Sequence, residues 1–277
     1  MRKSLFDRLM NNRFVLTTAK AVRVTNFVNP VLGMLGLTRR IPGTDLQYRL
    51  RYCDTPILVR SLFKLGEYGM LEKEASRIRT FVDLGCNVGL FPLYLCKLRR
   101  DRQVRGIVVD ANPDVVTEAR GNLKLNGLDQ QVQACHGLAG AARTGSQEFT
   151  LTPNSMSSTV DRDLLGTTIG TRRIQVPSID IARKWVDRMG EETRIDLLKM
   201  DIEGCELEFI EANEDLLSRC DRVILEFHKP KVTLAMTDQA LSRLGFACLG
   251  VRDFDSDPWG IAYFGRPTPS RNTHSAG

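Results

Sequence analysis

The sequence predicts an α/β domain in which a mostly parallel sheet of about seven strands carries helices on both faces, after an N-terminal helical extension. Short apolar runs alternate with helical patterns along most of the chain, which is typical of parallel sheets. Several of these runs end on an acid, as strands do where they deliver polar groups to a site. With 277 residues, 42% hydrophobic and 26% charged, the chain suits one soluble domain plus an extension.

The central element is the stretch from Thr80 to Phe91, TFVDLGCNVGLF. A short apolar run ends on Asp83, Gly85 and Gly89 follow, and a helical pattern then begins. In an open α/β sheet such a turn lies at the carboxyl end of a strand, where ligands bind. Glycine accepts positive φ angles and lets a ligand approach the backbone closely.

The spacing of this turn, Asp83-x-Gly85-x-Asn87-x-Gly89, lacks the third glycine of the dinucleotide motif G-x-G-x-x-G. An acid directly before the turn would repel a pyrophosphate but suits a cationic ligand. S-adenosylmethionine carries both a sulfonium and an α-amino group, so it is a candidate. The alternative, a tight strand-to-helix turn with no ligand, stays open.

Positive charge is concentrated in the N-terminal part of the chain. Residues 1–60 hold 11 Lys and Arg against three acids, whereas residues 61–277 hold 28 against 30. We predict a basic helical extension over residues 1–43, which would contact nucleic acid or an anionic membrane surface, or would simply expose a solvated face. Residues 44–79 have helical periodicity with a break at Gly66, and this lead-in could form a wall or lid over the ligand.

The cysteine pattern favours a reducing compartment. The seven cysteines form no C-x-x-C pair, so we expect reduced thiols in a cytoplasmic protein, with neither a disulfide framework nor a zinc site. We expect no secretory signal, because Pro30 and Gly33 interrupt the apolar stretch 27–37. That stretch is also shorter than the ~20 residues that a membrane-spanning helix needs.

A second strand–helix unit follows the first. The run 106–109 ends on Asp110, and Asn112 with Pro113 is typical of a helix N-cap and first position. An acid at the end of the second strand often holds the ribose hydroxyls of a nucleotide. The alternative is that Asp110 is a further helix-capping acid.

The third strand is predicted at 132–135, and His136 follows it. Residues 138–177 form an insertion in which two β segments, QEFTLTP and RRIQVPS, enclose a stretch rich in Ser, Thr and Gly. Loops of this length are usually functional or disordered. We therefore expect the insertion to contact the substrate.

Two further strands carry polar residues at their ends. The run 195–200 ends on Asp201 with Glu203 close behind, and the run 223–227 brings Glu226 and His228. Pro230 prevents the latter strand from continuing within a sheet. Two last strands, near 245–250 and 261–266, complete a catalytic domain over 80–266, and the polar tail 267–277 is predicted to be disordered.

Because the carboxyl ends of parallel strands share one edge, these side chains are expected to converge on one crevice. A core without a site would not place acids so regularly at strand ends. The converging residues are Asp83, Asp110, Asp201, Glu226 and His228.

With these motifs the chain resembles the class I S-adenosylmethionine-dependent methyltransferases, and more narrowly the FkbM family. The resemblance covers roughly residues 50–228 and rests on CDTPILVRSLFKLGEY, FVDLGCNVGLF, VDANP, VPSID, LLKMDIEGCELE and LEFH. One departure is Asp110, where the family more often has glutamate, although either carboxylate can hold a ribose. The resemblance implies a Rossmann-like fold and methyl transfer to oxygen, often a hydroxyl of a sugar, a polyketide or another secondary metabolite.

The resemblance also implies positions for the cofactor. The glycine turn would hold the methionine part of S-adenosylmethionine, Asp110 the ribose, and the 135–137 turn would lie near adenine. The predicted cofactor-binding residues are Asp83, Gly85, Asn87, Gly89, Asp110, Ala111 and His136.

A hydroxyl acceptor must lose its proton as it attacks the methyl group. Asp201 and His228 are the candidates for the base, with Glu226 orienting the histidine. Two alternatives stay open: His228 would cap the next helix, and Asp201 with Glu203 would cap the helix that follows them. Asp201, Glu226 and His228 would permit a Mg²⁺ ion, but their spacing does not require one, so we expect no metal.

Rival functions are less consistent with the sequence. A nucleic-acid methyltransferase would suit the basic leader, but the fourth strand ends in Asp-Ile-Glu-Gly rather than in an Asn/Asp-Pro-Pro-aromatic motif, and there is no Pro-Cys pair. A dehydrogenase is disfavoured by the missing glycine, and a non-catalytic binding module by the set of carboxylates. The expected partners are a small molecule or saccharide (a glycan, lipid-linked saccharide or secondary metabolite) and an anionic membrane surface at the basic N-terminus, with no nucleic acid.

Overall fold

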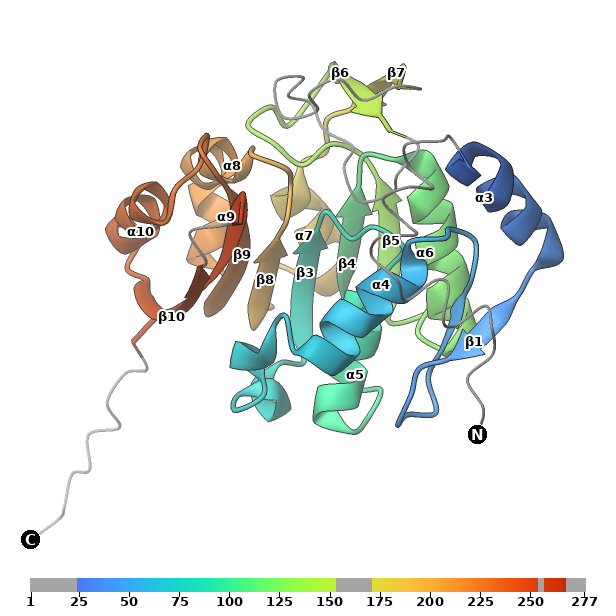
Figure 1. The fold of residues 1–277 in the computed structure, drawn as a ribbon. Coiled ribbons are helices and arrows are strands. Elements are labelled where there is room, and N and C mark those ends of the chain that lie inside the picture. Colours follow the sequence, from blue (N-terminus) through green and yellow to red (C-terminus); the bar gives the residue numbers. More distant parts are fainter. Residues whose placement is uncertain (1–23, 153–170, 254–256, 268–277) are drawn as a thin grey trace, which may run out of the picture.

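The centre of the fold is a seven-stranded sheet (Figure 1). The computed structural model describes residues 24–152, 171–253 and 257–267. The strands of the sheet are β3 (Thr80–Leu84), β4 (Arg105–Asp110), β5 (Val132–His136), β8 (Leu197–Met200), β9 (Arg222–His228), β10 (Ala247–Asp253) and β11 (Trp259–Gly265).

The strand order is β10-β11-β9-β8-β3-β4-β5. From β9 to β5 all neighbouring strands are parallel, whereas β11 is antiparallel to both β9 and β10. The predicted α/β class, with about seven mostly parallel strands, is confirmed. As predicted, β9 ends before Pro230.

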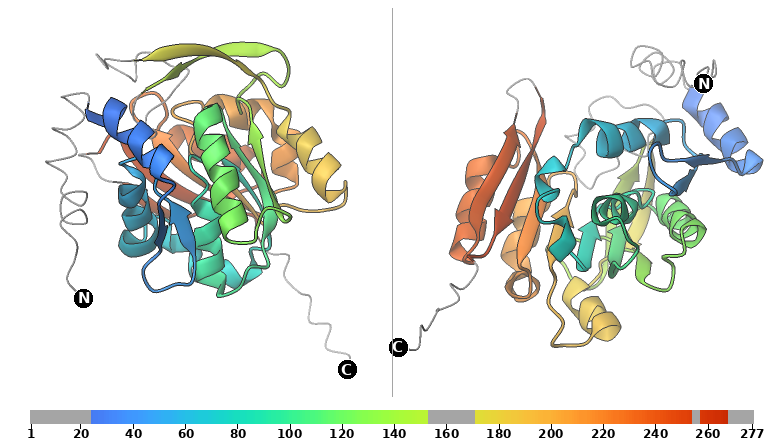
Figure 2. Two further views of the ribbon diagram at one scale, coloured as in Figure 1. Left: turned by 90° about the vertical axis from the view of Figure 1, so that its right-hand side faces the viewer. Right: turned by 90° about the horizontal axis from the view of Figure 1, so that it is seen from below.

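Helices cover both faces of this sheet (Figure 2), because successive strand residues point to opposite sides. Phe81 packs against helices on one side, whereas Val82 packs against those on the other. The first side holds α4 (Thr55–Arg60), α5 (Phe91–Arg99) and α6 (Pro113–Leu125). The second side holds α7 (Ile181–Met189), α8 (Glu206–Ala212), α9 (Glu214–Ser218) and α10 (Leu234–Arg243).

The start of α6 confirms the predicted cap. The Asn112 side chain accepts a hydrogen bond from the backbone N–H of Asp114 at 3.0 Å, and Pro113 takes the first helical position. The asparagine oxygen satisfies one of the unpaired donors of the first helical turn, and the proline, which has no N–H, removes another.

The N-terminal extension was predicted to be helical over residues 1–43, but its described part also contains a strand. Helix α3 (Val24–Leu35) is followed by a hairpin of β1 (Thr38–Arg40) and β2 (Gln47–Arg49). The hairpin is fixed from α6, where the side-chain oxygens of Asn122 and Asn126 accept the backbone N–H groups of Arg49 and Gln47. These partners lie far along the chain, so local periodicity does not reveal them.

The lead-in to β3 was predicted to be helical over residues 44–79; its first part is strand β2, and its helical part begins at Thr55. Helix α4 continues into a π-helical segment, Ser61–Leu65, which ends at Gly66 with φ 64°. Two 3₁₀ turns, Gly69–Leu71 and Ala75–Arg77, then lead into the sheet.

The two β segments of the insertion pair with each other. Strands β6 (Ser146–Leu151) and β7 (Arg172–Pro177) form an antiparallel ribbon above the carboxyl edge of the main sheet (Figures 1 and 2). The Ser-, Thr- and Gly-rich stretch between them falls largely within 153–170, and it lies outside the described residues, as do 1–23 and most of the predicted disordered tail.

Helix α3 presents apolar side chains to solvent. Met34 is 88% exposed, and Val31 and Leu35 are also exposed. Within the described ranges, every helix is too short or too polar to cross a membrane. All seven cysteines are free, six of them buried and Cys248 exposed.

Candidate active site at the carboxyl edge of the sheet

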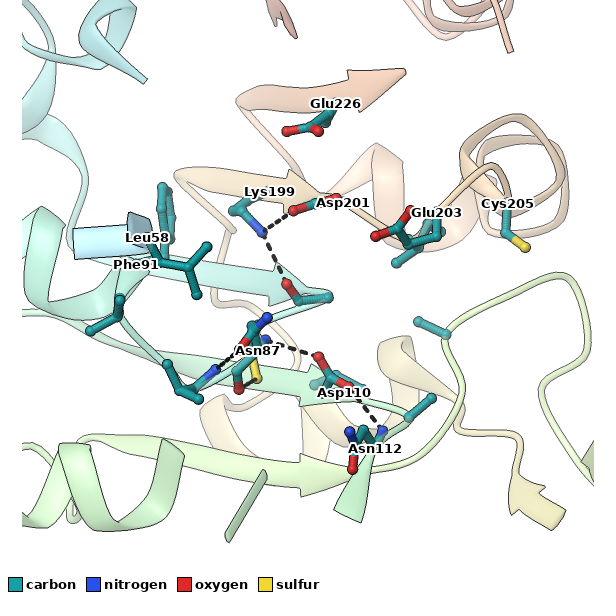
Figure 3. Close-up of a pocket in the computed structure, with 18 of the residues that line it drawn as sticks. Leu58, Asn87, Phe91, Asp110, Asn112, Lys199, Asp201, Glu203, Cys205 and Glu226 are labelled. Carbon is teal, nitrogen blue, oxygen red and sulfur yellow. Dashed lines mark hydrogen bonds and ion pairs between the residues drawn. The ribbon is translucent and has the colours of Figure 1, made fainter. Parts of the chain in front are cut away.

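The carboxyl ends of the central strands border one pocket (Figure 3). Asp110 reaches it from β4, Asp201 and Glu203 from the turn after β8, and Glu226 from β9. The predicted convergence is therefore confirmed for Asp110, Asp201 and Glu226. Glu203, which the prediction treated only as a possible cap, joins them.

The two glycines of the central turn have φ angles of 73° at Gly85 and 72° at Gly89. A Cβ atom on Gly85 would lie 1.7 Å from the carbonyl oxygen of Asp201, and one on Gly89 would lie 2.9 Å from Cβ of Ala119. Both glycines therefore allow the turn to pack tightly on neighbouring segments of the protein. Gly85 and Asn87 line the pocket, whereas Gly89 is not among its lining residues.

Asp83 lies beneath the pocket and is paired within the protein. Its Oδ1 is 2.9 Å from Nζ of Lys199, and Lys199 also donates a hydrogen bond to the carbonyl oxygen of Gly85 at 3.2 Å. Burial opposes a charge on Lys199, but Asp83 and Asp201 outweigh it and raise the pKa of the lysine. Asp83 does not line the pocket, so we correct the expectation that it would meet the cofactor directly.

Lys199 itself lines the pocket, although it is not among the residues predicted for the site. Its ammonium group lies over the rings of Tyr68 and Phe91, 6.0 and 5.8 Å from their centroids. The available signal was a single charged residue within an otherwise apolar strand, LLKM. Such a residue has to find a partner once it is buried.

Asp110 connects two loops at the end of β4. Its Oδ2 accepts the backbone N–H of Asn87 at 2.8 Å, and its Oδ1 accepts that of Asn112 at 2.9 Å. Burial raises the pKa of Asp110 to about 6, although both backbone hydrogen bonds act in the opposite direction. Because Asn112 caps α6, the capping alternative does not account for Asp110.

His136 supports the pocket from behind. Its Nε2 is 3.1 Å from the carbonyl oxygen of Ala111, which lines the pocket, whereas His136 does not. The apolar wall on this side consists of Leu138, Ala139 and Phe149, the last from β6. The insertion therefore contributes to the pocket.

The lead-in contributes the opposite wall. Leu58 of α4 lines the pocket together with Leu62, Glu67 and Tyr68. This segment therefore forms part of the pocket wall. Burial raises the pKa of Glu67, and the negative charge of Asp201 adds to the effect.

The turn after β8 is held by a buried carboxylate. Oε1 of Glu206 accepts the backbone N–H groups of Ile202 and Gly204, at 3.2 and 3.1 Å. Glu203 has a φ of 54°, a left-handed conformation that is uncommon outside glycine. The N-cap of α8, Cys205, makes no side-chain capping hydrogen bond, and neither Asp201 nor Glu203 is the N-cap.

His228 lies among four carboxylates. Its Nδ1 is 3.1 Å from Oε1 of Glu206, and its Nε2 is 3.5 Å from Glu203 Oε2. The same Nε2 lies 3.7 Å from Glu226 Oε1 and 4.0 Å from Asp201 Oδ1. The histidine is therefore oriented by Glu206, which corrects the expectation that Glu226 has this role.

The charge of His228 follows from these neighbours. Burial would lower its pKa, but the hydrogen bond to Glu206 and the negative charges of Glu206, Asp201 and Glu203 raise it to about 10. In the absence of a bound cation this pKa favours the imidazolium at neutral pH, and in that form His228 cannot accept a proton. It does not cap the next helix either, because the N-cap of α10 is Thr233.

The pKa values of the neighbouring carboxyls are raised as well, and for them this favours the neutral form. Burial and the charge of Asp201 raise the pKa of Glu203 to about 8, with His228 acting against them. The same causes raise the pKa of Glu226. These raised pKa values mean that it is unfavourable for the carboxyls on the β8–β9 side of the pocket to be charged together, and a bound cation would favour their charged forms.

The sequence from residue 83 to residue 248 matches the family model of the methyltransferase FkbM domain. No curated protein sequence matches the chain. A human methyltransferase 10 domain-containing protein has a similar structure, with TM-score 0.50 and 11% identity, covering 89% of this chain and 98% of that one. An FkbM methyltransferase from Methylobacillus flagellatus KT is 17% identical with TM-score 0.48, covering 68% of this chain and 43% of that one.

Proposed function

Because the chain belongs to the FkbM methyltransferase family, we propose that it methylates a hydroxyl oxygen of a small molecule or a sugar. The fold is that of the class I methyltransferases, and the cofactor is S-adenosylmethionine. The observation that supports this function is the meeting of Asp110, Asp201, Glu203 and Glu226 in one pocket at the carboxyl edge of the sheet.

The residues present fit the cofactor. Asp110 uses one hydrogen bond on each carboxylate oxygen, which leaves lone pairs free for hydroxyl donors such as those of a ribose. The apolar wall of Leu138, Ala139 and Phe149 suits a purine, whereas the acidic side of the pocket suits a sulfonium and an ammonium group. When bound, the cofactor supplies an activated methyl group.

Asp83 acts through Lys199 rather than on the ligand. The lysine ties the strand end to the carbonyl oxygen of Gly85, and so fixes the turn against which the methionine part would lie. A preorganised turn lowers the cost of ordering the site on binding.

Asp201 is our candidate for the group that takes the hydroxyl proton. It lines the pocket, and its side chain is 29% exposed, so an acceptor can reach it. His228, as an imidazolium, would instead hold the carboxylates of Asp201 and Glu203 in place by its charge. General-base assistance of this kind contributes about 10²–10⁴-fold in rate, and alignment of the acceptor contributes more.

Calorimetric titration with S-adenosylmethionine, with NAD as the control, tests the cofactor. A methylation assay over hydroxylated acceptors, beginning with glycosides and including matched amines, then tests the acceptor atom. Methylation of the amines alone would contradict the proposal of a hydroxyl acceptor.

The same proposal includes contact with an anionic membrane surface in the cytoplasm. Residues 1–23 hold six Lys and Arg against one acid, and the adjoining helix α3 exposes Val31, Met34 and Leu35. Basic and apolar side chains together are the combination that anionic bilayers attract. Helix α3 lies toward the same edge of the sheet as the β6–β7 ribbon (Figure 1), so a lipid-linked saccharide would be presented close to the pocket.

A further inference from the structure

Three side chains at the ends of β8 and β9 are arranged as ligands of one ion. One atom from each of Asp201, Glu203 and His228 lies within 4.8 Å of the others. His228 Nε2 is 3.5 Å from Glu203 Oε2 and 4.0 Å from Asp201 Oδ1. An ion about 2.1 Å from each ligand separates opposite ligands by about 4.2 Å. We propose that Asp201, Glu203 and His228 bind a divalent metal cation.

The orientation of His228 distinguishes this cluster from a chance group of acids. Its Nδ1 contacts Oε1 of Glu206, a residue with no solvent exposure whose carboxylate is fixed by two backbone N–H groups. Metal-binding histidines almost always donate their second ring N–H in this way, commonly to a carboxylate. With Nδ1 engaged, Nε2 faces Asp201 and Glu203, and it binds a cation by giving up the proton that the metal-free imidazolium carries.

The charge balance of the pocket favours a cation. Glu67, Asp110, Asp201, Glu203 and Glu226 line it, and the single lysine on its wall, Lys199, is engaged by Asp83 at 2.9 Å and by Asp201 at 3.7 Å. Glu226 Oε1 lies 3.7 Å from His228 Nε2, close enough to serve as a fourth ligand or to hold a water on the ion. Its carboxylate accepts no hydrogen bond from the described part of the chain.

The ligand set indicates which cation would bind. Mg²⁺ and Ca²⁺ prefer oxygen ligands alone, whereas imidazole favours first-row transition metals. Two carboxylates and one imidazole therefore suit a cation such as Mn²⁺, Fe²⁺ or Zn²⁺. Three protein ligands leave coordination positions open, and since Asp201 and Glu203 line the pocket, these positions are accessible from it.

The cluster is separate from the carboxylate assigned to the ribose. Strand β3 lies between β8 and β4, so Asp201 and Asp110 are two strand spacings apart, about 10 Å. The metal would thus lie on the acceptor side of the pocket. Its role in the reaction rests on the proposed function: a coordinated hydroxyl loses its proton more readily, and Asp201 would bind the ion through one carboxylate oxygen and take that proton with the other. The site itself does not depend on that role.

Titration of the full chain with Mn²⁺ after chelation, with free Mn²⁺ followed by electron paramagnetic resonance, tests the site. We expect the wild type to bind one equivalent. Glu203→Gln and Asp201→Asn should each weaken binding by at least about 10–100-fold, the loss typical of disturbing even an outer-shell residue. Glu208→Gln is the matched control, because Glu208 lies on α8 and pairs with Lys231 outside the cluster.

Thermal melting of each variant establishes that it is folded. The proposal would be overturned if the wild type showed no saturable Mn²⁺ binding. It would also be overturned if both cluster variants bound Mn²⁺ with the affinity of the wild type. Displacement of Mn²⁺ by S-adenosylmethionine would likewise overturn it, since the cluster would then serve the sulfonium. Calorimetry with S-adenosylmethionine on the same samples separates the two proposals. Cofactor binding without Mn²⁺ binding would overturn only the metal site. Mn²⁺ binding without methyl transfer would overturn only the proposed methylation of a hydroxyl.

Discussion

Asp83 and Lys199 are direct partners on two parallel strands, and Oδ1 of Asp83 lies 2.9 Å from Nζ of Lys199. The Asp83 side chain is 0% exposed and the Lys199 side chain is 5% exposed. The pair joins β3 to β8 immediately below the pocket. Asp83 has Lys199 as its charged partner, whereas Lys199 also lies 3.7 Å from Oδ2 of Asp201, so removing the lysine alone is costly for Asp83.

Lys199→Met should therefore lower the free energy of unfolding by about 3–5 kcal/mol, because it leaves Asp83 buried without its partner. Urea denaturation of the wild type, of Asp83→Leu, of Lys199→Met and of the double variant measures the effect. The double variant should be more stable than the sum of the single changes implies. Simple additivity would contradict the coupling.

Asp110→Ala should weaken S-adenosylmethionine binding by about 1–3 kcal/mol, the cost of losing a hydrogen bond to a charged group. Calorimetry measures this directly. Asp114→Ala is the control, because Asp114 is exposed in the first turn of α6, the helix that follows β4. Unchanged affinity in Asp110→Ala would remove Asp110 from the cofactor site.

Asp201→Asn should lower kcat by about 10²–10⁴-fold while changing cofactor affinity little, because the change removes the proton acceptor but keeps the shape of the side chain. Steady-state kinetics with a methylated acceptor, together with calorimetry, separates the two effects. Glu211→Gln on the exposed face of α8 provides the comparison. Full turnover in Asp201→Asn would place the base elsewhere.

His228 should make stability depend on pH. Its folded-state pKa of about 10 lies above the ordinary value of 6.5, so the folded protein holds the proton more tightly. The stabilisation is then complete below pH 6.5 and is lost as the pH rises toward 10. Urea denaturation across this range should give a falling free energy of unfolding, and His228→Gln should flatten the curve. A slope that is the same in the variant would argue against a charged His228.

Met34→Ser with Leu35→Ser should weaken binding to vesicles that contain anionic lipid, because these side chains are exposed on α3. Co-sedimentation at low and high salt measures the apolar and electrostatic parts of the binding. Leu249→Ser, an exposed leucine on β10, is the control. If the wild-type protein did not co-sediment with anionic vesicles, the membrane proposal would be contradicted.

The features that could be predicted from the sequence are those that a local pattern of residues determines. The strand–helix alternation, the cap at Asn112, the break at Gly66 and the β segments of the insertion each depend on neighbouring residues. Convergence of the strand ends followed from parallel topology alone. The β1–β2 hairpin escaped prediction because its fixing partners, Asn122 and Asn126, are more than 70 residues away.

The site was less predictable at the level of single contacts. Glu206 and Glu226 are equally plausible partners of His228 in the sequence, and only the packing of α8 against the end of β9 decides between them. Lys199 was not predicted as a site residue, because its role depends on its burial beside Asp83 and not on a spacing in the sequence. The glycines were predicted to admit a ligand, whereas the close approaches at Gly85 and Gly89 are to the protein itself.

The position of β11 between β9 and β10 has a consequence for the order in which the protein assembles during synthesis. A ribosome releases β9 and β10 before β11, yet the neighbour of both strands is the one made last. Until residues 259–265 emerge, the strand that carries Glu226 and His228 has an open edge, and β10 has no partner in the sheet. The strand that carries Glu226 and His228 therefore gains its second neighbour in the sheet only after β11 has been synthesised.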